Sequence, residues 1–146
     1  MHAFKFERHD FLDEPLAGLL EGVVRSGGDL RFDAVVPVPM SRAKLRRRGY
    51  NQAELLARAV AKRLKIRCEP RFLSRIVERQ TQSSLARAAR AANVRGVFKA
   101  LPQTRGASVL LVDDICTTGE TFRACAETLL DGGAGRVCAI AVAKAT

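Results

Sequence analysis

A run of mainly apolar residues at 107–112 constrains the fold most strongly, because apolar and polar positions do not alternate in it. Such a run is typical of a strand that is buried on both faces, as in a parallel sheet. Residues 33–39 and 136–143 are similar apolar segments, while residues 51–64 and 122–130 have helical periodicity. Strand–helix–strand order with short connections predicts right-handed βαβ units. We therefore expect an α/β fold of three layers with a central, mostly parallel sheet.

The other segments are compatible with one domain of this class. A length of 146 residues suits a single hydrophobic core, so we expect residues 1–146 to form one domain. Five further segments complete the prediction: a helix over 11–25, a cation-rich loop at 41–49, a weakly marked strand at 66–73, a helical hood or flap over about 74–98, and a turn at 101–106.

The formal net charge of +10 favours anionic partners such as nucleic acid, acidic lipid or a polyphosphate substrate. A generally basic surface is the alternative, since Arg outnumbers Lys. No apolar run reaches the roughly 18 residues of a membrane span, and the start of the chain lacks the apolar stretch of a secretory signal. We therefore expect a cytoplasmic protein. The four cysteines are not paired at C-x-x-C spacing, so the sequence predicts no zinc site.

Residues 109–121 combine two kinds of chemistry directly after the most apolar strand. Asp113 and Asp114 can accept hydrogen bonds from two neighbouring hydroxyls, such as those of a ribose. The amide groups from Thr117 to Thr121 lie at the start of a predicted helix, where a phosphate is bound favourably. Gly119 allows close approach of the backbone and a positive φ. Carboxylates for a diol and amides for a phosphate predict a ribose 5-phosphate ligand, although a helix cap or a simple metal site would use some of the same residues.

The same segment resembles the signature of type I phosphoribosyltransferases in its apolar lead, its Asp pair and its Thr-Thr-Gly-x-Thr sequence, and departs from it at Cys116. The resemblance implies that Asp113 and Asp114 hold the ribose of phosphoribosyl pyrophosphate. It also implies Mg²⁺ between pyrophosphate and ribose oxygens, bound to Asp113 and Asp114 only through substrate or water. The residues that would surround the 5-phosphate are Ile115, Cys116, Thr117, Thr118, Gly119, Glu120 and Thr121.

Three further segments, at 35–39, 44–57 and 82–98, resemble the ComF (competence protein F) family of phosphoribosyltransferase-like proteins. The Arg-Gly-Tyr-Asn-Gln block at 48–52 is the most specific of them, and the resemblance extends over nearly the whole chain. Many members have an N-terminal zinc ribbon of paired cysteines, which this sequence lacks. Met40 and Ser41 stand where Leu-His is common in the family.

Five cations occur within residues 42–48, directly after a predicted strand. In type I enzymes the loop after this strand contacts pyrophosphate, so the resemblance implies such a role here. Lys44, Arg46 and Arg48 are our predicted pyrophosphate ligands. A solvated run of charge or a nucleic-acid footprint are the alternatives. Asn51 is predicted to cap the helix that follows.

Three functions remain open at this level. The first is a Mg²⁺-dependent transferase that acts at C1 of the ribose, for which no general base or other catalytic residue can be assigned. The second is a competence-related module that binds single-stranded DNA, mainly through backbone charge because aromatic residues make up only 5% of the chain. The third is a sensor that binds phosphoribosyl pyrophosphate without converting it. A homodimer is compatible with each of them.

Overall fold

The computed structural model describes residues 3–76 and 96–146, and the statements below concern these residues. Along the chain, the helices and strands are α1 (Ala3–Ser26), β1 (Ala34–Pro37), α2 (Arg42–Arg48), α3 (Gln52–Leu64), β2 (Arg67–Cys68), β3 (Leu73–Arg75), β4 (Phe98–Ala100), β5 (Ser108–Cys116), α5 (Glu120–Asp131) and β6 (Arg136–Lys144). Two short 3₁₀ helices, Pro70–Phe72 and Pro102–Thr104, connect them. Within the described ranges, no helix is both long and apolar enough to cross a membrane.

The main sheet has the strand order β2-β1-β5-β6, and all neighbouring strands are parallel. β5 is central: it pairs with β1 from Val109 to Val112 and with β6 along nearly its whole length. β3 and β4 form a separate antiparallel pair. The predicted α/β class with a mostly parallel sheet is therefore confirmed.

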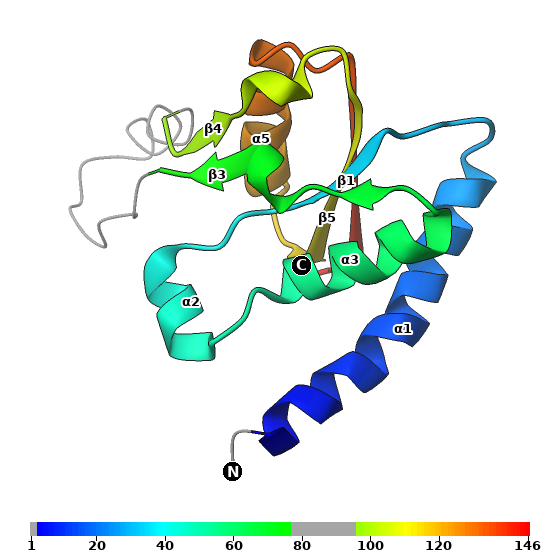
Figure 1. The fold of residues 1–146 in the computed structure, drawn as a ribbon, viewed down its shortest axis with the longest axis vertical. Coiled ribbons are helices and arrows are strands. Elements are labelled where there is room, and N and C mark those ends of the chain that lie inside the picture. Colours follow the sequence, from blue (N-terminus) through cyan, green and yellow to red (C-terminus); the bar gives the residue numbers. More distant parts are fainter. Residues whose placement is uncertain (1–2, 77–95) are drawn as a thin grey trace.

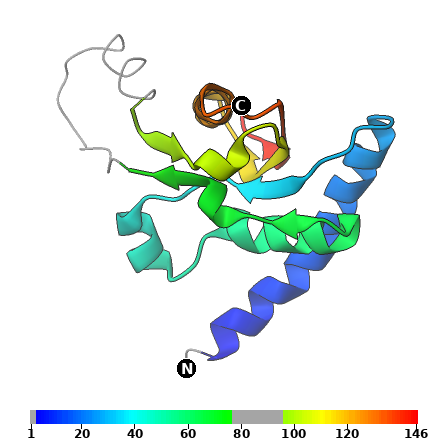
Figure 2. The ribbon, with the colours of Figure 1, turned by 45° about the horizontal axis from the view of Figure 1, so that its top comes forward.

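Both faces of β5 are covered from Val109 to Val112, which explains the unbroken apolar sequence of these residues. Val109 and Leu111 lie in one core cluster with residues of α5 and of the β3–β4 pair, such as Leu129 and Phe98. Leu110 and Val112 lie in a second cluster, with residues of α1 and α3 such as Leu20 and Leu56. Figures 1 and 2 show the resulting layers, with α5 on one side of the sheet and α1 and α3 on the other.

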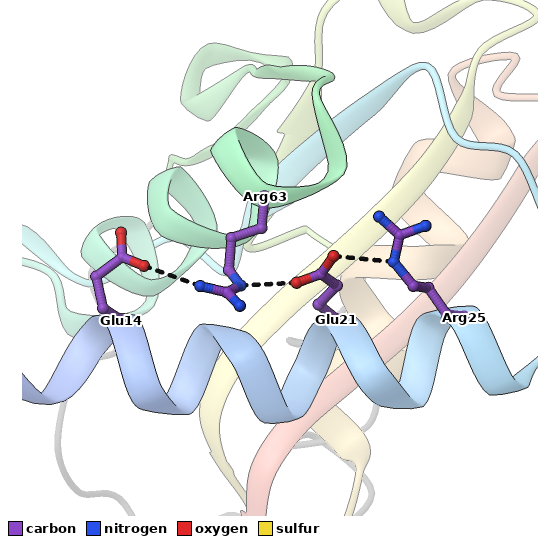
Figure 3. A network of polar contacts seen from close by, with 4 residues as sticks. All are labelled: Glu14, Glu21, Arg25 and Arg63. Atoms are coloured by element: carbon purple, nitrogen blue, oxygen red, sulfur yellow. Dashed lines mark hydrogen bonds and ion pairs between the residues drawn. The ribbon is translucent and has the colours of Figure 1, made fainter.

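Ion pairs join α1 to α3 on the exposed side of the layer that these two helices form (Figure 3). Arg63 of α3 bonds Glu21 at 2.7 Å and Glu14 at 3.2 Å, and Glu21 also accepts a 2.9 Å hydrogen bond from Arg25. Gly18 lies beneath the Arg63 guanidinium, where an added Cβ would meet Nη2 at 3.3 Å. Exposed ion pairs contribute little individually, so the buried apolar residues of α1, such as Leu20, contribute more than this network to holding α1 on α3.

Several predicted boundaries were wrong. Residues 42–48 form helix α2 and not a loop, because Ser41 and Gly49 cap it at its two ends. The single strand expected at 66–73 is split into β2 and β3 around Pro70, which has no amide donor for a sheet. The expected hood begins and ends in strand, since Ser74 and Arg75 belong to β3 and Phe98 to β4. Residues 77–95 of that hood lie outside the described residues.

Candidate functional site

Asp113 and Asp114 lie at the carboxyl end of the sheet, as predicted for a ligand site in a parallel α/β fold. β1 pairs with β5 up to Val112, which lies opposite Pro37, whereas β5 continues to Cys116 beside β6 alone. The two aspartates are therefore the first residues of β5 beyond the end of β1. Both are half-buried, between the fully buried Val112 and the 52% exposed Ile115.

The two carboxylates interact with each other and with their own backbone. The amide of Asp114 donates to Oδ1 of Asp113 at 2.9 Å, and the amide of Ile115 donates to Oδ1 of Asp114 at 2.9 Å. Burial, and then the side-chain hydrogen bond with Asp114, raise the pKa of Asp113 to about 7, while the Lys44 charge lowers it. A perturbed acid beside a second acid at an accessible edge is a common property of functional sites.

The segment after β5 leads into the N-terminus of α5 through Gly119. This glycine is the N-cap residue and has the left-handed conformation, with φ 81° and ψ −2°. It offers no side chain as a cap, and the Thr118 hydroxyl accepts only a long hydrogen bond of 3.4 Å from the Glu120 amide. The first amides of a helix have no partner within the helix, so they remain suited to an anion.

The hydroxyl-bearing residues of this segment are accessible. Thr117, Thr118 and Thr121 are exposed, as is Glu120, whereas Cys116 and Gly119 are half-buried. The predicted phosphate segment is thus at the surface beside the aspartate pair, where a sugar phosphate could enter. What the sequence did not predict is that β5 itself includes Asp113, Asp114, Ile115 and Cys116.

Helix α2 holds the cations that were predicted to contact pyrophosphate. The Ser41 hydroxyl accepts a 3.3 Å hydrogen bond from the Lys44 amide, and the left-handed Gly49 donates its amide to the Leu45 carbonyl at 2.7 Å. None of its residues is buried. Figure 1 shows α2 set apart from the sheet at the end of the segment that leaves β1. Ser41 and Gly49 are ordinary cap signals, which could have identified the helix from sequence.

Of the three predicted pyrophosphate ligands, Lys44 is the one with a described interaction with the aspartates. The charge of Lys44 lowers the pKa of Asp113, and the Val38 amide joins the β1–α3 connection to β5 through a 2.9 Å hydrogen bond to the Val112 carbonyl. Arg46 and Arg48 lie on the exposed surface of the same short helix. Arg42 and Arg47 add to this surface, so the helix is cationic throughout.

Asn51 is confirmed as the N-cap of α3, since its Oδ1 accepts a 3.1 Å hydrogen bond from the Ala53 amide. Its Nδ2 also donates to the Val38 carbonyl at 3.1 Å. The neighbouring Gln52 bonds in another direction, to Oδ1 of the buried Asp13 in α1 at 2.6 Å. The Asn-Gln pair of the Arg-Gly-Tyr-Asn-Gln block therefore makes two separate connections. Neither partner, Val38 nor Asp13, could be identified from a sequence signal.

The side chains at and around Asp113 and Asp114 determine whether this site suits a metal ion. In the described parts of the chain, no three His, Cys, Asp or Glu side chains gather as a metal-binding group. Two adjacent carboxylates are nevertheless hard oxygen donors of the kind that Mg²⁺ prefers, and Mg²⁺ usually keeps water and substrate oxygens as its other ligands. The pair fits a magnesium ion that a bound substrate helps to hold.

Two known proteins are similar in sequence to this chain over nearly its whole length. The DNA utilization protein YhgH of Salmonella typhimurium LT2 is 33% identical over 141 residues, covering 94% of this chain and 62% of that protein. Competence protein F of Haemophilus influenzae is 32% identical over 152 residues, covering 97% and 65% of the two chains. The resemblance to the ComF family is thus confirmed, although the chain spans less than two thirds of these relatives.

Solved structures show the same fold. Glutamine phosphoribosylpyrophosphate amidotransferase from B. subtilis superposes with a TM-score of 0.60 at 20% identity, over 92% of this chain and 26% of that one. Adenine phosphoribosyltransferase from Saccharomyces cerevisiae gives a TM-score of 0.54 at 17% identity, over 88% and 64%. The family model described as the phosphoribosyl transferase domain matches residues 49–145. This chain therefore belongs to the phosphoribosyl transferase domain family.

Proposed function

We propose that this protein binds phosphoribosyl pyrophosphate at the carboxyl end of β5. The main support is the position of Asp113 and Asp114 immediately beyond the end of β1 and before the Gly119-capped start of α5. The carboxylates accept hydrogen bonds from the 2′ and 3′ hydroxyls of the ribose. The segment from Ile115 to Thr121 surrounds the 5-phosphate, with the helix dipole and the amides of α5 favouring its charge.

The pyrophosphate is bound by the cations of α2, with Lys44, Arg46 and Arg48 as its ligands. Lys44 has the best support, because its charge already acts on Asp113. A guanidinium can bind two phosphate oxygens at once, whereas an ammonium acts as a point charge. Asp113 and Asp114 would also hold Mg²⁺ indirectly, through substrate oxygens or water, and the ion would neutralise negative charge on the pyrophosphate.

The reaction that this arrangement supports is transfer of the phosphoribosyl group. The bond between C1 and the pyrophosphate oxygen breaks, pyrophosphate leaves with the electron pair, and a nucleophile forms the new bond to C1. The Asp pair orients the ribose, and the α2 cations stabilise the charge on the leaving pyrophosphate. The acceptor nucleophile is not assigned. The proposed location of the protein is the cytoplasm, where such a substrate occurs.

Isothermal titration tests the binding site. Wild-type protein with Mg²⁺ is expected to bind phosphoribosyl pyrophosphate and, more weakly, ribose 5-phosphate. Asp113→Asn together with Asp114→Asn should reduce the affinity for both ligands by at least about 100-fold, since two charge-assisted hydrogen bonds are lost. Asp29→Asn together with Asp131→Asn, an equal charge change at two exposed positions, is the matched control. Binding that survives the double substitution would refute the site. A pyrophosphate-release assay over nucleobases and amines then separates a transferase from a sensor.

DNA binding is a second function, favoured by one specific feature: α2 presents five cations and no buried residue. A phosphate backbone would bind such a helix through charge alone, with a steep dependence on salt. Changing Arg46, Arg47 and Arg48 to Gln should make the dependence on salt shallower. The slope of log K for binding single-stranded DNA against log salt concentration is negative, and its magnitude should fall by about two. The matched control neutralises three exposed cations elsewhere, Arg31, Lys62 and Arg71. Equal slopes in the two triple variants would exclude α2 as the DNA-binding surface.

A further inference from the structure

Residues 38–51 leave the body of the protein after β1 and return to it at the start of α3. α2 and its five cations lie within this segment. The two ends of the segment are joined by one side chain, because Nδ2 of Asn51 donates to the Val38 carbonyl at 3.1 Å. Val38 and Asn51, joined by this hydrogen bond, form the neck of the segment.

The neck is directly connected to the aspartate pair. The amide of Val38 donates to the Val112 carbonyl at 2.9 Å, and Val112 immediately precedes Asp113 in β5. Asn51 is thus linked through Val38 and Val112 to the residues proposed to hold the ribose. The position of α2 relative to Asp113 depends on this short path.

Apolar packing contributes little to holding α2, since none of its residues is buried. At the neck, by contrast, Val38 is 6% exposed and Asn51 is half-buried, so their hydrogen bond is partly shielded from water. A shielded hydrogen bond at the base of an exposed segment restricts the segment as a whole.

We propose that Asn51 is a positioning residue, which joins the two ends of residues 38–51 and so fixes the orientation of α2 and its cations relative to Asp113 for the pyrophosphate. The ligand part of this inference rests on the proposed function above. Asn51 itself does not touch the ligand. Its second role, as the cap of α3, is separate because it uses the other atom of the amide, Oδ1.

Asn51→Ser separates the two roles. Serine is as good an N-cap as asparagine, but its side chain is shorter and has no amide group to reach Val38. The affinity for phosphoribosyl pyrophosphate is expected to fall about 10-fold, whereas that for ribose 5-phosphate changes less than about twofold, since the latter has no pyrophosphate to bind. The melting temperature should stay within about 2 °C of wild type, because the cap is kept.

Gln52→Ala is the matched control at the next position, because Gln52 bonds Asp13 in α1 and not the neck. It should lower the melting temperature while the ratio of the two affinities stays at its wild-type value. An equal loss of both affinities in Asn51→Ser, together with a lower melting temperature, would show that Asn51 supports the fold as a whole and does not position α2 for the pyrophosphate, and would overturn the proposal. Unchanged affinities would overturn it as well.

Trypsin gives a readout that does not depend on any ligand. The cations of α2 are themselves trypsin sites, and cleavage within residues 42–48 reports how often this segment opens. Asn51→Ser should raise the rate of cleavage there about 5- to 10-fold, as identified by mass spectrometry, and Gln52→Ala should leave that rate near wild type. If wild type binds neither ligand, the proposed function fails, while the cleavage rates still decide whether Asn51 holds α2. Equal rates in wild type and Asn51→Ser would refute that role.

Discussion

At the scale of single residues, Asp113 makes the stability of the protein depend on pH. Its pKa is raised to about 7, first by burial and then by the hydrogen bond with Asp114, whereas an unfolded Asp titrates near about 3.9. Between these values the folded protein keeps a proton that the unfolded chain has lost. The stability contributed by protonated Asp113 is therefore complete below about pH 4 and is lost as the pH rises through about 7.

Asp113→Asn should abolish this dependence. The variant is expected to be more stable than wild type at pH 8, on the order of 1–2 kcal/mol after allowing for partial exposure of the group, and equal to it at pH 4. Urea unfolding at pH 4, 6 and 8 measures the difference. Asp29→Asn, at an exposed turn, is the control and should follow wild type throughout. A variant no more stable than wild type at pH 8 would contradict the pKa assignment.

The position of a residue could be predicted from the sequence where it depends on its neighbours in the chain. The Asp pair directly follows the buried, apolar part of β5 and Gly119 comes soon after it, so their position at the carboxyl end of the strand could be inferred from the apolar run alone. The partners of Asn51 and Gln52 could not. Val38 is 13 positions from Asn51, and Asp13 is 39 positions from Gln52, so both contacts depend on how the helices pack.

At the scale of elements, the close contact between α5 and β4 depends on a small residue. A Cβ at Gly132 would lie 2.8 Å from the Ala100 Cβ, which is too close, and 3.3 Å from the Thr128 carbonyl oxygen, which is tight. Gly132→Ala should therefore destabilise the protein by about 1–3 kcal/mol, measured by thermal or urea unfolding. Gly22→Ala in α1, where nothing lies within 4 Å, should instead stabilise it by about 0.5–1 kcal/mol. Equal effects at the two positions would show that the contact is not tight.

The elements that could be predicted from sequence are those with a strong period or an unbroken apolar run, such as α3, β5 and α5. α2 was missed because its cations suggested a solvated loop, although Ser41 and Gly49 supplied both cap signals. The β3–β4 pair was missed for a different reason. Strands of three residues have almost no local pattern, and their pairing joins residues 73–75 to 98–100 across a long sequence separation.

At the scale of the whole molecule, ligand binding should be visible as stabilisation. A ligand that binds only the folded protein, at about 100 times its Kd, adds about 2.7 kcal/mol, or about 5–10 °C in a domain of this size. Phosphoribosyl pyrophosphate with Mg²⁺ is expected to give such a shift in a thermal melt, and excess EDTA should reduce it. Inorganic phosphate at the same concentration is the control. A shift no larger than that of phosphate would mean that the ribose is not recognised.

The early end of β1 divides this molecule into parts that can change independently. Among the described residues, β6 is the one strand that pairs with β5 beyond Val112, and after the Val38 amide, which still bonds β5, the segment that follows β1 makes no strand pair. Substitutions in that segment can alter the chemistry offered to a leaving group without disturbing the sheet or the acids that hold the sugar. A domain built in this way can acquire new reactions, or lose its original one, while its recognition of a pentose phosphate stays intact.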